Sequence, residues 1–177
     1  MIKLRYFDQA DFKQLIDWVE TPEFMLQWGG SSFIFPLNEF QLEEYLKGAN
    51  GKNSASYIYS VVDAETEALI GHISLTRIDM NNRSARIGRV LIGDPDAKGK
   101  GICKEMMQQT LAIAFDELQL HRVTLGVFDF NKPAIACYER TGFQKEGFMR
   151  DHQKFDDEYW SQWEMGILED EWRKIAK

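Results

Sequence analysis

The sequence has few of the features that stabilise small secreted domains. It contains two cysteines in 177 residues. Cys103 and Cys137 match neither a Cys-x-x-Cys metal pair nor a disulfide-rich framework. We expect each to pack as a small buried apolar residue. A chain of this length buries roughly two-thirds of its unfolded surface, so packing alone can carry the fold.

Long apolar runs are also missing. No run approaches the ~20 residues that span a bilayer. Residues 1–5 enter a strand pattern without the apolar segment of a signal peptide. These absences predict a cytoplasmic protein with no membrane partner.

An excess of positive charge is absent as well. The chain carries 21 Lys+Arg and 28 Asp+Glu, a formal net charge of −7. Neither half of the sequence forms a basic patch or an acidic tail. A nucleic acid is therefore not expected as a partner, and the mild acidity favours a cationic small molecule or a basic peptide.

The hydrophobic pattern predicts one domain over residues 1–177, without repeats or a linker. Its class is α/β (α+β), with a mixed, mostly antiparallel central sheet and helices on both faces. Period-two segments indicate strands at 2–6, 57–62, 68–78, 84–92, 123–128, 143–149 and 159–167. Apolar residues spaced three and four apart, with capping residues, indicate helices at about 9–19, 39–47, 101–118, 133–140 and 169–176.

A glycine- and lysine-rich loop over residues 98–101 indicates an anion site. The loop follows strand residues 90–92 and opens a long helix. Such a loop points free backbone N–H groups at one spot, where the helix dipole adds partial positive charge. Phosphate is the favoured anion, and a solvated lysine turn is the alternative. Neither a Walker loop nor a dinucleotide fingerprint fits, because Lys104 stands where the latter requires glycine.

A second motif, Asn131-Lys-Pro-Ala-Ile-Ala-Cys-Tyr138-Glu-Arg-Thr-Gly-Phe143, follows after one predicted strand. With the glycine-lysine loop, in this order and at this spacing, the chain resembles the GNAT superfamily of acetyl-CoA-dependent N-acetyltransferases. The resemblance extends over nearly the whole chain. Within the superfamily it is closest to the branch of ribosomal-protein N-terminal and spermidine acetyltransferases.

The resemblance implies a GNAT-like fold, acetyl-CoA as co-substrate, no metal, and acetyl transfer to a primary amine by direct attack in a ternary complex. The acceptor would be a protein or peptide α-amine, a polyamine or another small amine. Tyr138 would protonate the leaving thiolate. The residues assigned to the cofactor are Val90, Leu91, Ile92, Lys98, Gly99, Lys100, Gly101, Ile102, Cys103 and Asn131.

The general base is not identified by this pattern. Many family members carry a carboxylate where this chain has Arg86. His72 and His152 are substitute bases by their ordinary pKa, and a structural role is the alternative for both. An α-amine has a pKa of about 7.7–8.0 and is substantially neutral near pH 7. The missing base therefore favours an α-amine acceptor.

The acceptor pocket is expected in the aromatic residues 23–36, which we interpret as a shaped loop. Trp28 is the candidate substrate-binding wall, since an aromatic face holds a cation or an apolar group. The alternative is that Trp28 seals the core edge or a homodimer contact.

Three other functions remain as alternatives. A non-catalytic acyl-CoA-binding or sensing domain would bind the cofactor without turnover. A nucleotide binder would prefer a triphosphate or dinucleotide to CoA. A thiol enzyme would depend on Cys103 or Cys137, although no histidine is tied to either by sequence.

Overall fold

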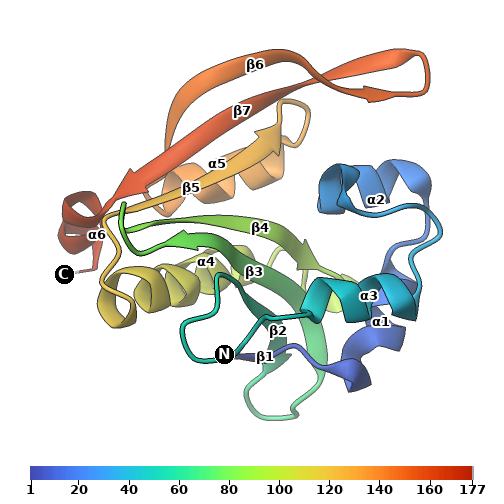
Figure 1. Cartoon of the computed structure of the whole chain (residues 1–177), viewed down its shortest axis with the longest axis horizontal. Helices are drawn as coiled ribbons and strands as arrows, with labels where there is room; N and C mark the ends of the chain where they lie inside the picture. The colour runs from blue at the N-terminus through green and yellow to red at the C-terminus, as the bar shows by residue number, and fades with distance from the viewer. Residues whose placement is uncertain (177) are drawn as a thin grey trace. The chain divides into compact units, whose positions relative to one another are not determined.

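The computed structural model describes residues 1–176, with seven strands in one mixed sheet of order β1-β2-β3-β4-β5-β7-β6 (Figure 1). The strands are β1 (Ile2–Tyr6), β2 (Tyr57–Asp63), β3 (Leu69–Asp79), β4 (Ser84–Ile92), β5 (Arg122–Phe128), β6 (Gln144–Phe155) and β7 (Glu158–Leu168). The helices are α1 (Phe12–Trp18), α2 (Pro22–Gly29), α3 (Glu39–Leu46), α4 (Ile102–Ala112), α5 (Lys132–Arg140) and α6 (Glu169–Ile175). Short turns of helix are η1 (Gln9–Asp11), η2 (Gly30–Ser32), η3 (Pro95–Ala97) and the π-helical η4 (Ile113–Glu117).

The chain divides into two compact units. Unit 1 contains residues 1–76 and 88–102, and unit 2 contains residues 77–87 and 103–177. Strands β3 and β4 contribute residues to both units. The sheet confirms the predicted fold class, and the assignment of residues 1–177 to a single domain stays a prediction.

Unit 1 packs helices α1 to α3 with strands β1 and β2. The two strands pair antiparallel from Ile2 with Asp63 to Tyr6 with Tyr59. Asp8 caps η1 in a capping box with Asp11, as an acid placed before an apolar helix predicts. The shared core is fully buried at Phe12, Leu15, Leu42 and Ile58.

Helix α2 corrects one prediction, because residues 22–29 are helical and not a shaped loop. The Oγ1 of Thr21 accepts a hydrogen bond from the Phe24 N–H at 3.1 Å, and Pro22 occupies the first turn. Gly30, at φ 62°, ends the helix. The aromatic and glycine content suggested a loop, but the Thr-Pro start and the buried face of Met25 and Trp28 set a helix.

Unit 2 is built on β5, β7 and β6, with α5 following β5 (Figure 1). Strand β5 pairs antiparallel with β7 over its whole length, from Arg122 with Leu168 to Phe128 with Gln162. Helix α4 buries Met106, Met107 and Leu111 completely. Its continuation as η4 agrees with the long helix predicted to about residue 118.

Two ion pairs in unit 2 each cross a middle strand at a glycine. Arg86 on β4 reaches Glu164 on β7, and an added Cβ on Gly126 of β5 would lie 2.6 Å from the Arg86 Nη2. Arg122 on β5 reaches Glu146 on β6 at 2.7 Å. An added Cβ on Gly166 of β7 would lie 2.5 Å from Glu146. A larger residue at either glycine would therefore displace the end of the crossing side chain, which occupies the space of a Cβ.

The structure corrects the expectation that the two cysteines pack separately. Cys103, in the first turn of α4, forms a disulfide with Cys137 on α5. Their Cα atoms are 6.4 Å apart across 34 residues of sequence, within the distance range of natural disulfides. The pairing depends on the placement of two helices that sequence spacing does not reveal.

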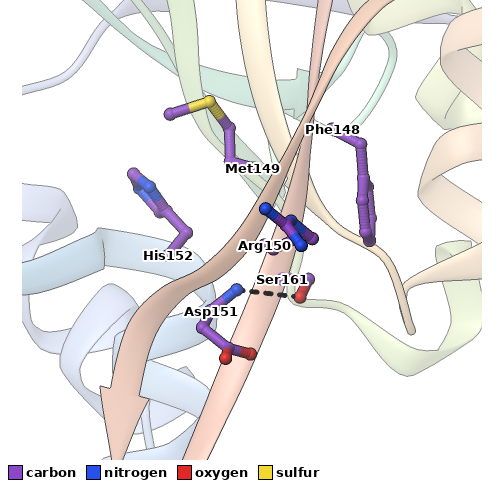
Figure 2. A pocket seen from close by; sticks show the side chains of 6 residues that line it. All are labelled: Phe148, Met149, Arg150, Asp151, His152 and Ser161. Atoms are coloured by element: carbon purple, nitrogen blue, oxygen red, sulfur yellow. Dashed lines mark hydrogen bonds between the residues drawn. The ribbon is translucent and has the colours of Figure 1, made fainter.

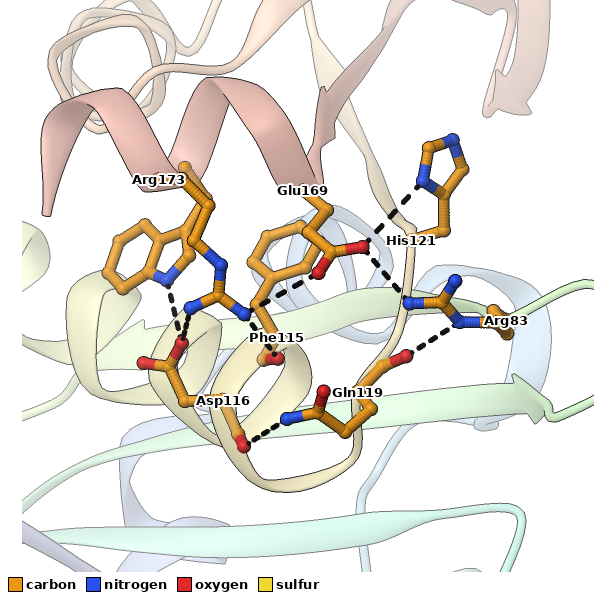
Figure 3. A network of polar contacts seen from close by, with 8 residues as sticks. Arg83, Phe115, Asp116, Gln119, His121, Glu169 and Arg173 are labelled. Carbon is orange, nitrogen blue, oxygen red and sulfur yellow. Dashed lines mark hydrogen bonds and ion pairs between the residues drawn. The ribbon is translucent and has the colours of Figure 1, made fainter.

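A polar network fixes the C-terminal helix of unit 2 (Figure 3). Arg173 of α6 pairs with Asp116 of η4, and its Nη2 donates to the Phe115 carbonyl at 3.2 Å. Glu169 accepts from Arg83 at 3.0 Å and faces His121 at 3.9 Å. His121 therefore belongs to a structural network.

Candidate functional site

The glycine-lysine loop lies between η3 and α4. Gly99 and Gly101 have φ of 77° and 79°, in the left-handed region that favours glycine, and a Cβ at either position would meet no atom within 4 Å. Lys98, Lys100 and Lys104 are exposed. The loop thus presents backbone N–H groups in open space beside free cations at the start of an eleven-residue helix. That combination suits an anion with several charges.

Strand β4 changes its pairing before the residues predicted to hold the cofactor. Its parallel ladder with β5 joins Ser84–Arg86 to Arg122–Thr124. Arg89 then adopts φ 51°, a left-handed conformation within the otherwise extended strand. Residues 90–92 follow Arg89, with Leu91 buried.

Helix α5 in unit 2 carries the predicted general acid. Tyr138 is 7% exposed, and desolvation raises the pKa of its hydroxyl. Asn131 caps the helix, with its Oδ1 accepting from the Ala134 N–H at 3.4 Å. The Nδ2 group of Asn131 is therefore the atom that could donate to a ligand.

Arg86, which the resemblance places where many family members carry a carboxylate, is paired with a carboxylate of its own unit. Its Nη1 pairs with the Oε1 of Glu164, and its Nη2 donates to the Oε2 at 3.1 Å. Nη1 also lies 3.4 Å from the Oγ1 of Thr124. A carboxylate is thus present beside this position, supplied by β7 instead of β4. Both of its oxygens accept hydrogen bonds from the guanidinium of Arg86.

An aromatic cluster in unit 1 surrounds Arg89. Trp28 is 7% exposed and stacks on Phe33 with ring centroids 5.5 Å apart. The Nε1 of Trp28 donates to the Arg89 carbonyl at 3.0 Å. The Oη of Tyr45 lies 3.1 Å from the Nε2 of His72. Trp28 is therefore part of a buried cluster, and its role as a substrate wall stays a prediction.

His72 is a weak candidate for the general base. It is 1% exposed, and desolvation together with the charge of Arg89 lowers its pKa to about 3. With that pKa the imidazole stays neutral near pH 7 and does not take up a proton from an amine. His72 therefore serves better as the hydrogen-bond partner of Tyr45.

His152 lies on an irregular stretch of β6. Residues 150–152 stand opposite Ser161 alone, because the register passes from Met149–Gln162 to Gln153–Trp160. The Asp151 N–H donates to the Ser161 Oγ at 3.0 Å (Figure 2). A hollow of about 810 Å³ opens over this bulge between Phe148 and His152. His152 is exposed there, so it remains accessible to an acceptor.

Residues 1–176 contain neither a helix suited to span a membrane nor a cluster of metal-ligating side chains. Among residues 1–176, no helix combines the length and apolar character of a bilayer span. Nor do the described residues group three or more His, Cys, Asp or Glu side chains in a way that could hold a metal ion.

Comparison with known proteins identifies the family. A family model described as acetyltransferase (GNAT) domain matches residues 2–144. The chain belongs to the GNAT acetyltransferase family. Such a match covers both the anion loop and the Asn131 to Phe143 motif.

Individual relatives agree with the family. The uncharacterised N-acetyltransferase p20 of Bacillus licheniformis is 34% identical over 96 residues, which cover 54% of this chain and 53% of that protein. Spermidine N(1)-acetyltransferase of Vibrio cholerae is 28% identical over 148 residues, covering 84% of this chain and 82% of that protein. The chain thus spans about half of the first relative and four-fifths of the second.

A solved structure extends the likeness to nearly the full length. The crystal structure of spermidine N-acetyltransferase from Vibrio cholerae, in complex with CoA and spermine, has a TM-score of 0.82 and 27% identity. The match covers 97% of this chain and 98% of that chain. These findings confirm the predicted GNAT family, the N-acetyltransferase class and acetyl-CoA as the co-substrate. The alternative of a non-catalytic acyl-CoA-binding domain is not favoured.

Two residues of interest were missed in the sequence. Glu164 pairs with Arg86 across β5, which follows only from the order of the strands. Arg89 carries an isolated charge among aromatic rings from α3 and the segment after α2. Its one sequence signal is a basic residue in a strand whose neighbours are apolar.

Proposed function

We propose that the chain transfers the acetyl group of acetyl-CoA to a primary amine by direct attack in a ternary complex. The observation that carries the proposal is the glycine-lysine loop, with two left-handed glycines at the N-terminus of α4, in a chain of the GNAT family. Acetyl-CoA supplies the activated thioester and a pyrophosphate that suits this loop.

The anion loop and β4 hold the co-substrate in this proposal. The backbone amides after Lys98, through Cys103, bind the pyrophosphate, with Gly99 and Gly101 keeping the approach open. The Lys98 N–H itself, which the sequence assigned to the same role, donates to the Pro95 carbonyl at 3.3 Å. Residues 90–92 offer backbone groups to the extended pantetheine arm. A backbone N–H near Leu91 donates to the oxygen on which negative charge develops.

Tyr138 is the proton donor in this proposal. Because burial raises its pKa, the phenol keeps its proton throughout the neutral range. Donation to a thiolate with an ordinary pKa of about 8.5 is uphill, so the proton moves as the carbon–sulfur bond breaks. The Nδ2 of Asn131 supplies a further hydrogen bond to the cofactor.

Two classes of acceptor amine are supported by different observations. The likeness to spermidine N-acetyltransferase favours a polyamine. The absence of a carboxylate at Arg86 favours an α-amine, which needs only water to carry its proton away. Trp28 is the proposed wall of the acceptor pocket, and a homodimer and a cytoplasmic location remain predictions.

Calorimetric titration with acetyl-CoA, with ATP and NAD in parallel, tests the co-substrate. Selective binding near 1 μM, about 8 kcal/mol, is expected. Stronger binding of either nucleotide would contradict the proposal.

Tyr138→Phe tests the proton donor. We expect turnover to fall by ~10²–10⁴ while the Kd for acetyl-CoA stays within about twofold. Tyr159→Phe, at a tyrosine that is 58% exposed, is the matched control and should retain full turnover. Unchanged turnover in Tyr138→Phe would remove the general-acid role.

A further inference from the structure

Arg89 is a partly buried cation without a counter-ion. Among the residues described, four arginines are partly buried, and three of them pair with a carboxylate: Arg5 with Asp11, Arg86 with Glu164 and Arg122 with Glu146. Arg89 has no carboxylate partner within residues 1–176. Its Nε is also the single buried side-chain nitrogen or oxygen in that part of the chain without a hydrogen-bond partner.

Aromatic rings hold the Arg89 guanidinium in place. Its central carbon lies 4.6 Å from the Tyr45 ring centroid and 5.2 Å from the Phe33 ring centroid. These two rings stand at 85° to each other, so they cover the group from two directions. The Tyr45 hydroxyl takes one hydrogen bond from this guanidinium, and stacking over aromatic rings leaves the remaining N–H donors for an oxyanion.

The buried acid of unit 1, Asp11, is already paired with another arginine. Asp11 is 4% exposed, and both of its oxygens accept from Arg5 at 2.7 Å. His72 is uncharged near pH 7, since its pKa is lowered. A buried donor without a partner and a charge without a counter-ion both destabilise the folded state. In a chain with seven more acids than bases, this unpaired cation calls for an anion from outside.

The position of Arg89 indicates which ligand supplies the anion. It directly precedes residues 90–92, which hold the co-substrate in the proposed function, and its carbonyl accepts from Trp28, the proposed acceptor wall. We propose that Arg89 binds a carboxylate of the acceptor, so that the substrate is a primary amine that also carries a carboxylate. This inference rests on the proposed acetyl transfer. It departs from the polyamine named for the Vibrio cholerae relatives, because a polyamine would bring more positive charge toward an unneutralised cation.

Matched acceptors test the carboxylate directly. One arm compares L-amino acids with their carboxamides, and a second compares peptides that begin with Glu or Gln. Spermidine is the cationic reference. The amine of a carboxamide has a lower pKa than the amine of the matching amino acid, so more of it is neutral at a given pH. This difference alone would favour the carboxamide, which is opposite to the expected result. The two arms also separate a free amino acid from a peptide as the source of the carboxylate.

We expect kcat/KM to favour the carboxylated member of one arm by roughly 10- to 150-fold, the range of a hydrogen bond to a charged group. Arg89→Gln should remove this preference and raise KM more than it lowers kcat. Arg89→Lys should restore part of it, because the charge remains without the bidentate geometry. Arg122→Gln, which removes a partly buried arginine of the paired class, should keep the preference of the unmodified chain.

Each outcome of these assays supports or overturns a specific claim. A higher kcat/KM for spermidine or for the carboxamides overturns the inference and leaves acetyl transfer intact. So does a preference for the carboxylated acceptor that is equally large in the unmodified chain and in a folded Arg89→Gln. If Arg89→Gln does not fold, two results test the inference instead: the preference of the unmodified chain for the carboxylated acceptor, and the partial loss of that preference in Arg89→Lys. Failure to bind acetyl-CoA overturns the proposed function, and binding without turnover of any amine overturns both.

Discussion

Reduction of the Cys103–Cys137 disulfide should cost a large part of the stability of unit 2. The bond joins positions 34 residues apart. In the chain-entropy model, a loop of 34 residues loses about 12.6 cal/mol/K on closure, or roughly 3.8 kcal/mol at 25 °C. Unfolding entropy of about 2.1 cal/mol/K per residue gives roughly 0.37 kcal/mol/K for 177 residues. Opening the disulfide should therefore lower Tm by about 10 °C.

Urea unfolding and calorimetry of the oxidised protein, with and without a phosphine reductant, measure this loss. Cys103→Ala is the matched variant, since Cys103 is only half-buried and leaves a smaller cavity than its buried partner. The variant should start at the lower stability and show no response to reductant. Maleimide labelling of the unfolded, unreduced protein should add no label, and labelling after reduction should add two.

Two results would refute this reasoning. Two reactive thiols in the freshly purified, unreduced chain would show that the pairing does not form. A disulfide whose reduction leaves Tm unchanged would show that the loop is already closed in the unfolded state. Disulfides are rare in reducing compartments, so the oxidation state in cells also tests the predicted cytoplasmic location.

Three further perturbations have defined outcomes. The pKa of His72 is about 3 in the fold and about 6.5 when unfolded, so its stabilisation is complete above pH 6.5 and is lost as pH falls toward 3. The free energy of unfolding, measured in urea, should therefore fall by about 2 kcal/mol between pH 7 and 5, and His72→Gln should remove that pH dependence. Gly101→Glu should abolish acetyl-CoA binding in calorimetry, whereas Gly48→Glu, at a φ of 75° with equal open space, should retain it. Gly126→Val should displace Arg86 and lower the free energy of unfolding by about 1–3 kcal/mol, measured in urea.

Local chemistry made most of the fold predictable. Six of the seven strands were predicted within one residue at each end, because period two and short turns specify them, whereas β6 was predicted to end at residue 149 and extends to Phe155. A helix was predicted at about 39–47, and α3 begins there behind Asn38, whose Oδ1 accepts from the Gln41 N–H at 3.0 Å. The error at α2 arose because aromatic residues and paired glycines outweighed the Thr21-Pro22 start in the reading of that stretch.

The site was less predictable, because its decisive features depend on tertiary placement. The positive φ of Gly101 follows from glycine in a turn, so the loop could be read from the sequence. The pairing of Cys103 with Cys137 requires the spacing of two helices, and that of Arg86 with Glu164 requires the strand order. No local pattern carries either piece of information.

Two arginines on β4 show why charge alone does not assign a role. Arg86 and Arg89 are three residues apart, and both stand among apolar neighbours in the sequence. The first crosses Gly126 to a carboxylate, so its charge is neutralised within the fold and an approaching amine meets little net field from it. The second rests on aromatic rings, which hold a cation without neutralising it. An oxyanion supplied by the acceptor gains the full interaction with Arg89, whereas at Arg86 it would have to displace Glu164. Of the two, Arg89 is therefore the residue through which a substrate charge can be selected.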